Sequence, residues 1–311
     1  MRVFVAGGTG VIGRTLLPML ASAGHQVAAT TRDPAKQRLI ESLGAAPFVL
    51  DALDRQAVIA AVKSFRPTAV MNQLTSLPEH YNPRRLKASY EATSRLRVDA
   101  TRTLLESAID VGANRFVYQS IAFFMYALTG PPVADEDAPL ALNAPEPFGG
   151  MIRATYEGER MATSADRTTG VVLRYGQLYG PGTYFARDGD FARLARRGML
   201  PIAGEGSGTV SFLHVDDAAG SALAALERGS GVYNITDDEP ALAREWIPAF
   251  CAAVGGSRPR RVPGWIVSLV AGSFATSQMK AGRGASNAKA KGELGWSPTR
   301  PTWRAGFMAD Q

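Results

Sequence analysis

The 311-residue chain is poor in the residues that build disulfide scaffolds and metal sites. It contains one cysteine, Cys251, and three histidines, His25, His80 and His214. A single cysteine forms no internal disulfide and no cysteine-based metal site, and histidines this far apart are not typical of a zinc enzyme. We therefore expect no metal cofactor.

The chain also lacks a long apolar run. Its longest apolar stretch, residues 265–271, is far shorter than the roughly 20 residues that a membrane-spanning helix needs. The first two residues lead directly into an apolar, strand-like segment, without the pattern of a signal peptide. We expect a soluble cytoplasmic protein with no membrane partner.

Basic residues moderately outnumber acidic ones, which gives a net charge of +6 and a pI of about 9.6. The basic residues are dispersed and form no stripe interleaved with aromatic residues, so we do not expect a nucleic-acid partner. Hydrophobic residues make up 46% of the chain, which is enough for one large core with a smaller lobe.

Strand-like and helix-like segments alternate along the first half of the chain. Such alternation indicates βαβ units and a Rossmann-type, doubly wound parallel sheet. After residue 176 the pattern loosens, so we predict an α/β fold with a Rossmann domain over 1–175. Residues 176–311 would mostly form a smaller α/β substrate lobe, interleaved with the last sheet strands. The predicted strands are 2–6, 26–30, 47–50, 68–74, 115–120 and 170–175, and the predicted helices are 14–23, 34–43, 55–65, 94–111 and 152–167.

The sequence GGTGVIG, residues 7–13, lies between the first predicted strand and the first predicted helix. In this context Gly7 permits the tight turn, Gly10 lets the backbone approach a pyrophosphate, and Gly13 lets the helix pack on the strand. The free N–H groups of the helix N-terminus favour the negative charge. We predict that the loop binds a dinucleotide, with Thr9, Val11 and Ile12 beside the glycines.

Four further segments carry a resemblance to a known family: LRYGQLYGPGT (173–183), SFLHVDDAA (211–219), GVYNITDDEP (231–240) and ELGWSP (293–298). With the Gly-x-x-Gly-x-x-Gly loop, they resemble the extended short-chain dehydrogenase/reductase family, the NAD(P)-dependent epimerase/dehydratase type. The resemblance runs over nearly the whole chain. It implies a nicotinamide cofactor, a small-molecule substrate and a homodimer.

The end of the second strand distinguishes NAD from NADP. An acidic residue there binds the ribose 2′-hydroxyl of NAD, and an arginine accommodates the 2′-phosphate of NADP. Here Thr31 and Arg32 occupy the place of the acid, and Asp33 comes one residue later as a helix cap. We predict NADP(H), with Arg32 and the hydroxyl of Thr30 or Thr31 holding the phosphate.

The resemblance implies further cofactor contacts at the ends of the later strands. The third strand supplies the adenine contacts, the fourth lines the ribose and nicotinamide side, and the sixth borders the nicotinamide ring. We also predict that Ser120 contacts cofactor or substrate, and that Asp54 caps a helix. The implied contacts are Asp51 and Ala52, then Gln73, Leu74 and Thr75, then Tyr175, Gly176, Gln177 and Leu178.

The family's catalytic pattern is missing from this chain. The family uses a Ser or Thr at the end of the fifth strand and Tyr-x-x-x-Lys on the next helix, where the phenol moves a proton and the lysine lowers its pKa. A Glu often follows the Tyr by eight positions. Counting back from Glu159 gives Met151, with Thr155 in the lysine place, and counting back from Glu157 gives Gly149. Neither frame supplies a phenol.

Two residues stand as candidate catalytic groups. Tyr156, with Arg160 four residues later, is the one look-alike of the dyad. Ser120 lies one residue before Ile121, which aligns without gaps with the catalytic Ser or Thr of the family. Arg97 stands where the family has an asparagine. We predict Ser120 and Tyr156 as catalytic, with the proton source left open.

On the substrate side, His214 is either a structural histidine or a substrate contact, and Asp216 and Asp217 are expected to cap the next helix. Together, the sequence features and the resemblance favour an NADPH-dependent reductase with an atypical proton source. Its substrate would be a ketone on a bulky small molecule, such as a polycyclic aromatic one. Two alternatives stay open. One is a nucleotide-sugar epimerase or dehydratase, and the other is a non-catalytic NADP(H)-binding regulator.

Overall fold

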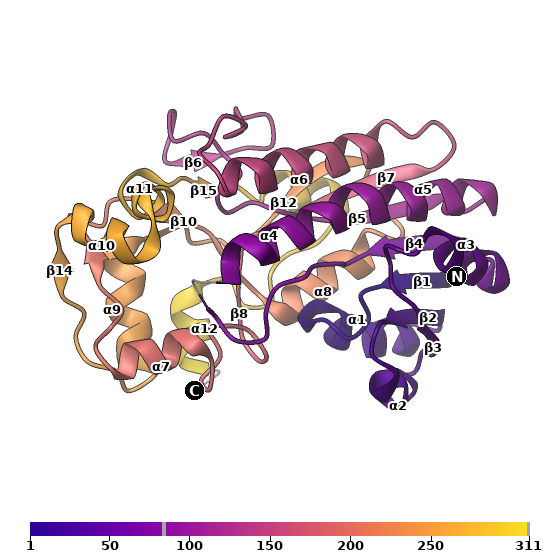
Figure 1. The fold of residues 1–311 in the computed structure, drawn as a ribbon, viewed down its shortest axis with the longest axis horizontal. Helices are drawn as coiled ribbons and strands as arrows, with labels where there is room; N and C mark the ends of the chain where they lie inside the picture. Colours follow the sequence, from indigo (N-terminus) through magenta and orange to yellow (C-terminus); the bar gives the residue numbers. More distant parts are fainter. Residues whose placement is uncertain (83–84, 310–311) are drawn as a thin grey trace.

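The computed structural model describes residues 1–82 and 85–309 and has a seven-stranded sheet at its centre. Its strands are β1 (Arg2–Ala6), β2 (Gln26–Thr31), β3 (Ala46–Val49), β4 (Ala69–Asn72), β5 (Arg115–Ile121), β7 (Thr169–Tyr175) and β12 (Gly231–Ile235). The strand order is β12-β7-β5-β4-β1-β2-β3, and every neighbouring pair is parallel. The chain thus winds outward from β1 in both directions, which confirms the Rossmann-type fold (Figure 1).

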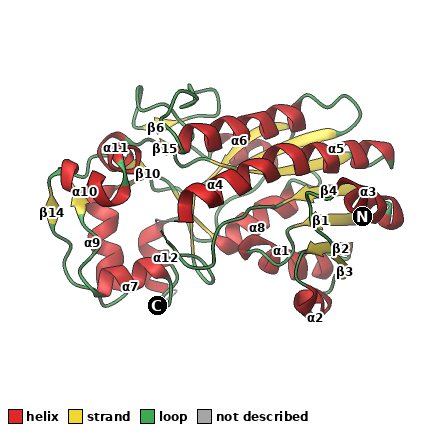
Figure 2. Ribbon diagram, in the orientation of Figure 1, coloured by secondary structure: helices red, strands yellow, loops and turns green. Residues whose placement is uncertain are grey.

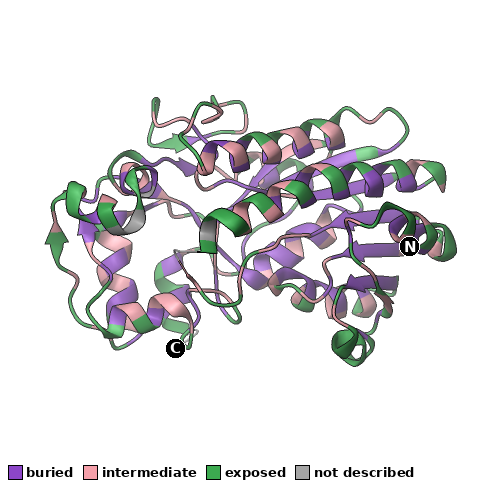
Figure 3. Ribbon diagram, in the orientation of Figure 1, coloured by how far each residue is buried: buried purple, intermediate pink, exposed green. Residues whose placement is uncertain are grey.

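Helices cover both faces of this sheet (Figure 2). On one face, α1 (Val11–Ser22) and α8 (Val215–Ala224) bury their apolar sides against the strands. On the other face, α3 (Arg55–Phe65), α5 (Thr101–Asp110) and α6 (Phe148–Thr163) do the same. The inner strands β1, β2, β4, β5 and β7 are accordingly buried on both sides, whereas the edge strand β3 has no buried residue and the outer sides of the helices are exposed (Figure 3).

The predicted helix over 94–111 is longer than expected and is interrupted by a π-helical turn. It begins as α4 (Leu86–Arg95), passes through Leu96–Ala100 as a π turn and continues as α5. The extra residue in the turn brings Arg97 into the interior, where its Nη1 donates to the carbonyl of Gln119 at 3.0 Å. The polar sequence of α4 had concealed the first part of this helix.

Short elements and an aromatic core build the rest of the chain. Phe212, Phe250, Trp303 and Phe307 pack together in this core. Because β12 returns to the sheet from beyond residue 175, the lobe and the sheet are interleaved, and the division at 175 stays a prediction. No helix in the described part of the chain is long and apolar enough to cross a membrane. The remaining elements are a 3-10 turn (Pro34–Lys36), α2 (Gln37–Ser42), β6 (Val133–Ala134), β8 (Gln177–Tyr179), α7 (Asp190–Arg196), β9 (Ile202–Ala203), β10 (Thr209–Val210), β11 (Phe212–His214), β13 (Ala241–Leu242), α9 (Ala243–Ala253), β14 (Arg261–Val262), α10 (Gly264–Ala271), α11 (Ser273–Ala281), β15 (Gly284–Ala285), a π turn (Ala290–Leu294) and α12 (Trp303–Ala309).

Side chains cap several helices, two as predicted and one differently. The carboxylates of Asp33 and Asp54 accept N–H groups at the start of the helices that follow them, which confirms both caps. The prediction that Asp216 and Asp217 cap α8 was wrong. His214 is the cap, since its Nδ1 accepts the N–H of Asp216 at 3.1 Å. The Asp217 carboxylate instead accepts N–H groups of the C-terminal segment.

Candidate active site

The carboxyl edge of the sheet brings most of the predicted cofactor residues together. Parallel strands all end at the same edge, so segments that follow different strands become neighbours there. The glycine loop follows β1, and a β-carbon on Gly7 would lie 2.7 Å from the carbonyl oxygen of Gln73, which follows β4. The other predicted residues at this edge are Thr31 and Arg32 (β2), Asp51 and Ala52 (after β3), Leu74 and Thr75 (after β4), Ser120 (β5), and Tyr175 to Leu178 (β7 and β8).

The glycine loop has the shape of a phosphate cradle. Gly7 has a positive φ of 93°, and a β-carbon on Gly13 would lie 2.4 Å from the Gly7 carbonyl oxygen, so both positions require glycine. Gly10 is the N-cap of α1 and has no side chain to cap the helix. A β-carbon there would meet only the Gly7 carbonyl, at 3.3 Å. The open space above an uncapped helix N-terminus fits a pyrophosphate.

At the end of β2 the two threonine hydroxyls already have backbone partners. The Thr30 hydroxyl accepts the N–H of Gly7 at 3.1 Å, and the Thr31 hydroxyl accepts the N–H of Asp33 at 3.1 Å. Arg32 is exposed, and no hydrogen bond or ion pair ties its guanidinium to the described residues. Arg32 is therefore a cation that the end of β2 offers to a ligand, and its role stays a prediction.

Two further polar groups lie between β4 and β7. The Gln73 Nε2 donates to the Tyr175 hydroxyl at 3.5 Å, while the Gln73 Oε1 is buried and has no partner among residues 1–82 and 85–309. Burial raises the pKa of Tyr175 well above its usual range, so this phenol stays protonated. An unpartnered buried amide oxygen at the carboxyl edge is consistent with a ligand that supplies the missing donor.

The burial of residues along α6 shows which of the two possible alignments with the family's Tyr-x-x-x-Lys pattern, counted from Glu159 or from Glu157, faces the sheet. Met151, Thr155 and Glu159 are buried along one side of the helix, with exposures of 7%, 0% and 2%. Tyr156 is 39% exposed on the outer side, and its neighbour Arg160 pairs with Glu157. The alignment counted from Glu159, with Met151 and Thr155 at the Tyr and Lys positions, is therefore the one whose residues face inward.

At the inward-facing positions that correspond to the family's catalytic Ser or Thr, Tyr and Lys, this chain has two apolar side chains and one hydroxyl that is already hydrogen-bonded. Ile121 and Met151 share one hydrophobic cluster with Phe274. The Thr155 hydroxyl donates to the Met151 carbonyl within the helix, at 2.8 Å. No phenol and no ammonium group stands at these positions.

Ser120 belongs to a buried polar network that the sequence did not reveal. Its hydroxyl is fully buried and donates to Glu159 Oε1 at 2.5 Å. Glu159 also accepts two bonds from Arg174, at 2.7 and 2.8 Å, and Arg174 in turn donates to the Tyr126 hydroxyl. Burial raises the pKa of Tyr126 and opposes its ionisation. The catalytic roles of Ser120 and Tyr156 stay predictions.

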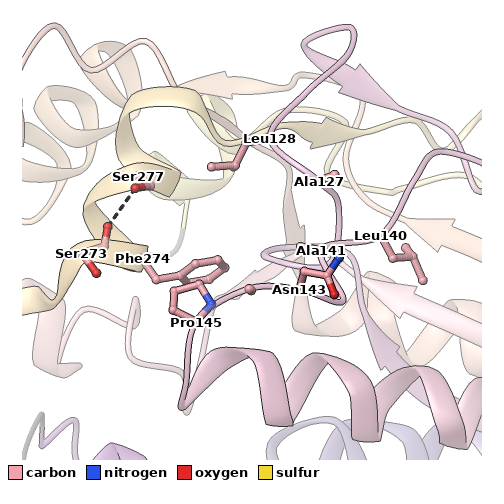
Figure 4. Close-up of a pocket in the computed structure, with 10 residues that line it drawn as sticks. Ala127, Leu128, Leu140, Ala141, Asn143, Pro145, Ser273, Phe274 and Ser277 are labelled. Atoms are coloured by element: carbon pink, nitrogen blue, oxygen red, sulfur yellow. Dashed lines mark hydrogen bonds between the residues drawn. The ribbon is translucent and has the colours of Figure 1, made fainter.

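A cavity of about 340 Å³ lies between α11 and the chain that connects β5 to α6 (Figure 4). Phe274 lines it and also belongs to the hydrophobic cluster that contains Ile121 and Met151. Its size lies within the usual range for small-molecule pockets. The lining residues, which are mostly apolar, are Ala127, Leu128, Leu140, Ala141, Asn143, Ala144, Pro145, Ser273, Phe274 and Ser277.

Comparison with known proteins identifies the family. The model of the NAD dependent epimerase/dehydratase family matches residues 3–236. The chain belongs to this family. It is 46% identical to a 3-diazoavenalumate denitrifying reductase from a Streptomyces species, with 99% of each chain covered.

More distant relatives agree with this membership. The chain is 28% identical to a 2-alkyl-3-oxoalkanoate reductase from Stenotrophomonas maltophilia, over 83% of this chain and 77% of the other. The Thermus thermophilus UDP-glucose 4-epimerase in complex with NAD shares the fold, with a TM-score of 0.74, 23% identity and coverage of 99% and 97%. The chain is an NAD(P)-dependent oxidoreductase of the extended short-chain type, without the Tyr-x-x-x-Lys dyad.

Proposed function

We propose that this protein is an NADPH-dependent reductase that replaces the diazo group of a bulky aromatic small molecule by hydrogen. The observation that carries the proposal is the set of side chains at the family's acid positions. Ile121 and Met151 hold no exchangeable proton, and the Thr155 hydroxyl is buried and bound within its own helix. Such a site suits a reduction that takes no proton from the protein.

Reduction of a diazonium group and reduction of a ketone differ in their need for a proton. Reduced nicotinamide supplies one hydride when it is bound. Carbonyl reduction adds that hydride to carbon and a proton to oxygen, and therefore needs an acid. A diazonium carbon that accepts hydride releases its nitrogen as N₂, and the balance closes with no proton. The name of the Streptomyces relative describes a denitrifying reduction of a diazo compound, which supports this choice.

The proposed cofactor is NADP(H) rather than NAD. Support comes from Arg32, an exposed cation at the end of β2 where an NAD-specific chain would carry an acid. The proposed aromatic part of the substrate is supported by the apolar cavity beside Phe274 (Figure 4). A cytoplasmic location and a homodimer stay predictions from the sequence.

A second candidate is the reduction of a ketone on an aromatic molecule. The ketone reduction is supported by the name of the Stenotrophomonas relative, a 2-alkyl-3-oxoalkanoate reductase. The proton would then come from water, from Ser120, or from an acidic hydroxyl of the substrate itself.

The experiment offers the purified protein NADPH deuterated at the transferred position, together with an aromatic diazonium, a polycyclic hydroxyketone and a sugar nucleotide. We expect NADPH oxidation and N₂ release with the diazonium, and deuterium on the ring carbon that carried nitrogen. Deuterium on a carbinol carbon would instead establish the ketone reductase. Sugar epimerisation, or NADPH binding without any turnover, would refute both reductions.

Thr155→Val gives a matched control, because valine keeps the shape and removes the hydroxyl. We expect the diazonium reduction by this variant to stay within about twofold of the parent. A tenfold loss at unchanged cofactor affinity would show that Thr155 supplies a proton, and would refute the proposed reason for the apolar site.

A further inference from the structure

We infer that Arg14 holds the pyrophosphate of the dinucleotide from the side opposite the glycine loop. Arg14 lies one turn into α1, directly after the last glycine of the loop. Its guanidinium reaches the turn at Gly182, where a β-carbon would lie 2.9 Å from Nη2 and 3.9 Å from Val11 Cγ2. The cation thus lies beside the first residue of α1.

The direction of the side chain follows from helix geometry. Side chains in an α-helix tilt toward its N-terminus, so a residue one turn in covers the surface over the first turn. The Arg14 guanidinium is therefore carried back toward Gly10 and Val11, the place where the loop approaches a phosphate. A guanidinium there can donate two parallel hydrogen bonds to phosphate oxygens.

Electrostatics point to an anion at this place. The N-terminus of a helix is its positive end and disfavours a cation in the first turn. The first turn of α1 holds no acidic residue, and no ion pair joins Arg14 to any side chain in residues 1–82 or 85–309. A bound pyrophosphate would compensate both the helix end and the guanidinium.

The turn at Gly180 and Gly182, against which the Arg14 guanidinium lies, accommodates that guanidinium because Gly182 has no side chain. Gly180 and Gly182 both have positive φ values, of 99° and 79°, and this turn leads from β8 into the C-terminal lobe. Any side chain at position 182 would meet the Arg14 guanidinium. The missing side chain therefore leaves room for the Arg14 guanidinium between α1 and the turn.

The test measures the affinity of the substrate-free protein for NADPH and for NADH by fluorescence titration. Since both cofactors contain the pyrophosphate, Arg14→Met should weaken both by the same factor, about 10- to 100-fold. Arg14→Lys should recover part of the loss, because it keeps the charge without the fork. Arg102→Met, which removes an exposed arginine of α5 that pairs with Asp99, should change neither affinity.

Three results would overturn the inference. Unchanged affinities would show that Arg14 does not contact the cofactor. A loss confined to NADPH would assign Arg14 to the 2′-phosphate, which we assign to Arg32. A lower melting temperature of the cofactor-free variant, with weaker binding, would mean that Arg14 only supports the Gly182 turn. No substrate is present, so these outcomes are independent of the proposed reaction.

Discussion

Two alanine substitutions in the glycine loop separate its role in folding from its role in cofactor binding. In Gly13→Ala the new β-carbon would lie 2.4 Å from the Gly7 carbonyl oxygen and 2.7 Å from the Gly8 backbone. Backbone atoms cannot swing aside as a flexible side chain does, so the loop must shift. We expect a loss of about 3 kcal/mol of stability, as in an overpacked core, and ~6 °C in melting temperature.

Gly10→Ala is the matched substitution in the same loop. Gly10 has ordinary dihedral angles of −70° and 173°, and its new methyl would meet only one atom, at 3.3 Å. The reduced freedom of the unfolded chain offsets a small cost at the cap, so stability should change by less than about 1 kcal/mol. The methyl instead fills the space above the helix N-terminus, and the loss of one charge-assisted hydrogen bond, about 1.5–3 kcal/mol, weakens NADPH binding roughly 10- to 100-fold.

The assay pairs thermal unfolding without cofactor with NADPH titration of both variants. We expect Gly13→Ala to melt early and Gly10→Ala to melt like the parent while binding NADPH poorly. If Gly10→Ala binds NADPH as tightly as the parent, the phosphate does not approach Gly10 and the reasoning is refuted.

Three other predictions concern the buried polar groups. Glu159→Gln leaves the buried Arg174 guanidinium without its carboxylate, so unfolding titrations should show a loss of about 3–5 kcal/mol in the free energy of unfolding. In the double variant with Arg174→Met, the loss of unfolding free energy should be smaller than the sum of the losses in the two single variants. Ser120→Ala removes a bond to the Glu159 carboxylate and should lower stability by about 1.5–3 kcal/mol. Tyr156→Phe, on the outer side of α6, should leave stability unchanged, and equal losses of stability in the two variants would contradict this placement. Burial raises the pKa of Asp237 from 3.8 to about 8, so the folded chain keeps a proton that the unfolded chain releases. Stability should therefore fall as the pH rises between these values, by at most about 1.4 kcal/mol per unit, and Asp237→Asn should flatten melting temperatures measured from pH 5 to 9; an equally steep profile would refute the assignment.

Much of the fold could be predicted because its signals are local. Alternating strands and helices, the glycine loop and the caps at Asp33 and Asp54 each depend on residues close in sequence. The π turn at Leu96–Ala100 was missed because a single extra residue leaves no mark on the hydrophobic pattern. The His214 cap was missed because histidine is not among the common capping residues, whereas the aspartates beside it are.

The site divides in the same way. The sequence alone determined the family resemblance, the phosphate loop, the missing acid at the end of β2 and the missing Tyr-x-x-x-Lys pair, because each is a short pattern read along the chain. Only the tertiary structure decided that Met151 and Thr155 face inward and that Tyr156 faces outward. It alone joined Ser120 to Glu159 and Arg174, and Arg14 to the turn at Gly182. Those relations depend on how helices pack against strands far away in the sequence, and packing fixes which side of each helix is buried.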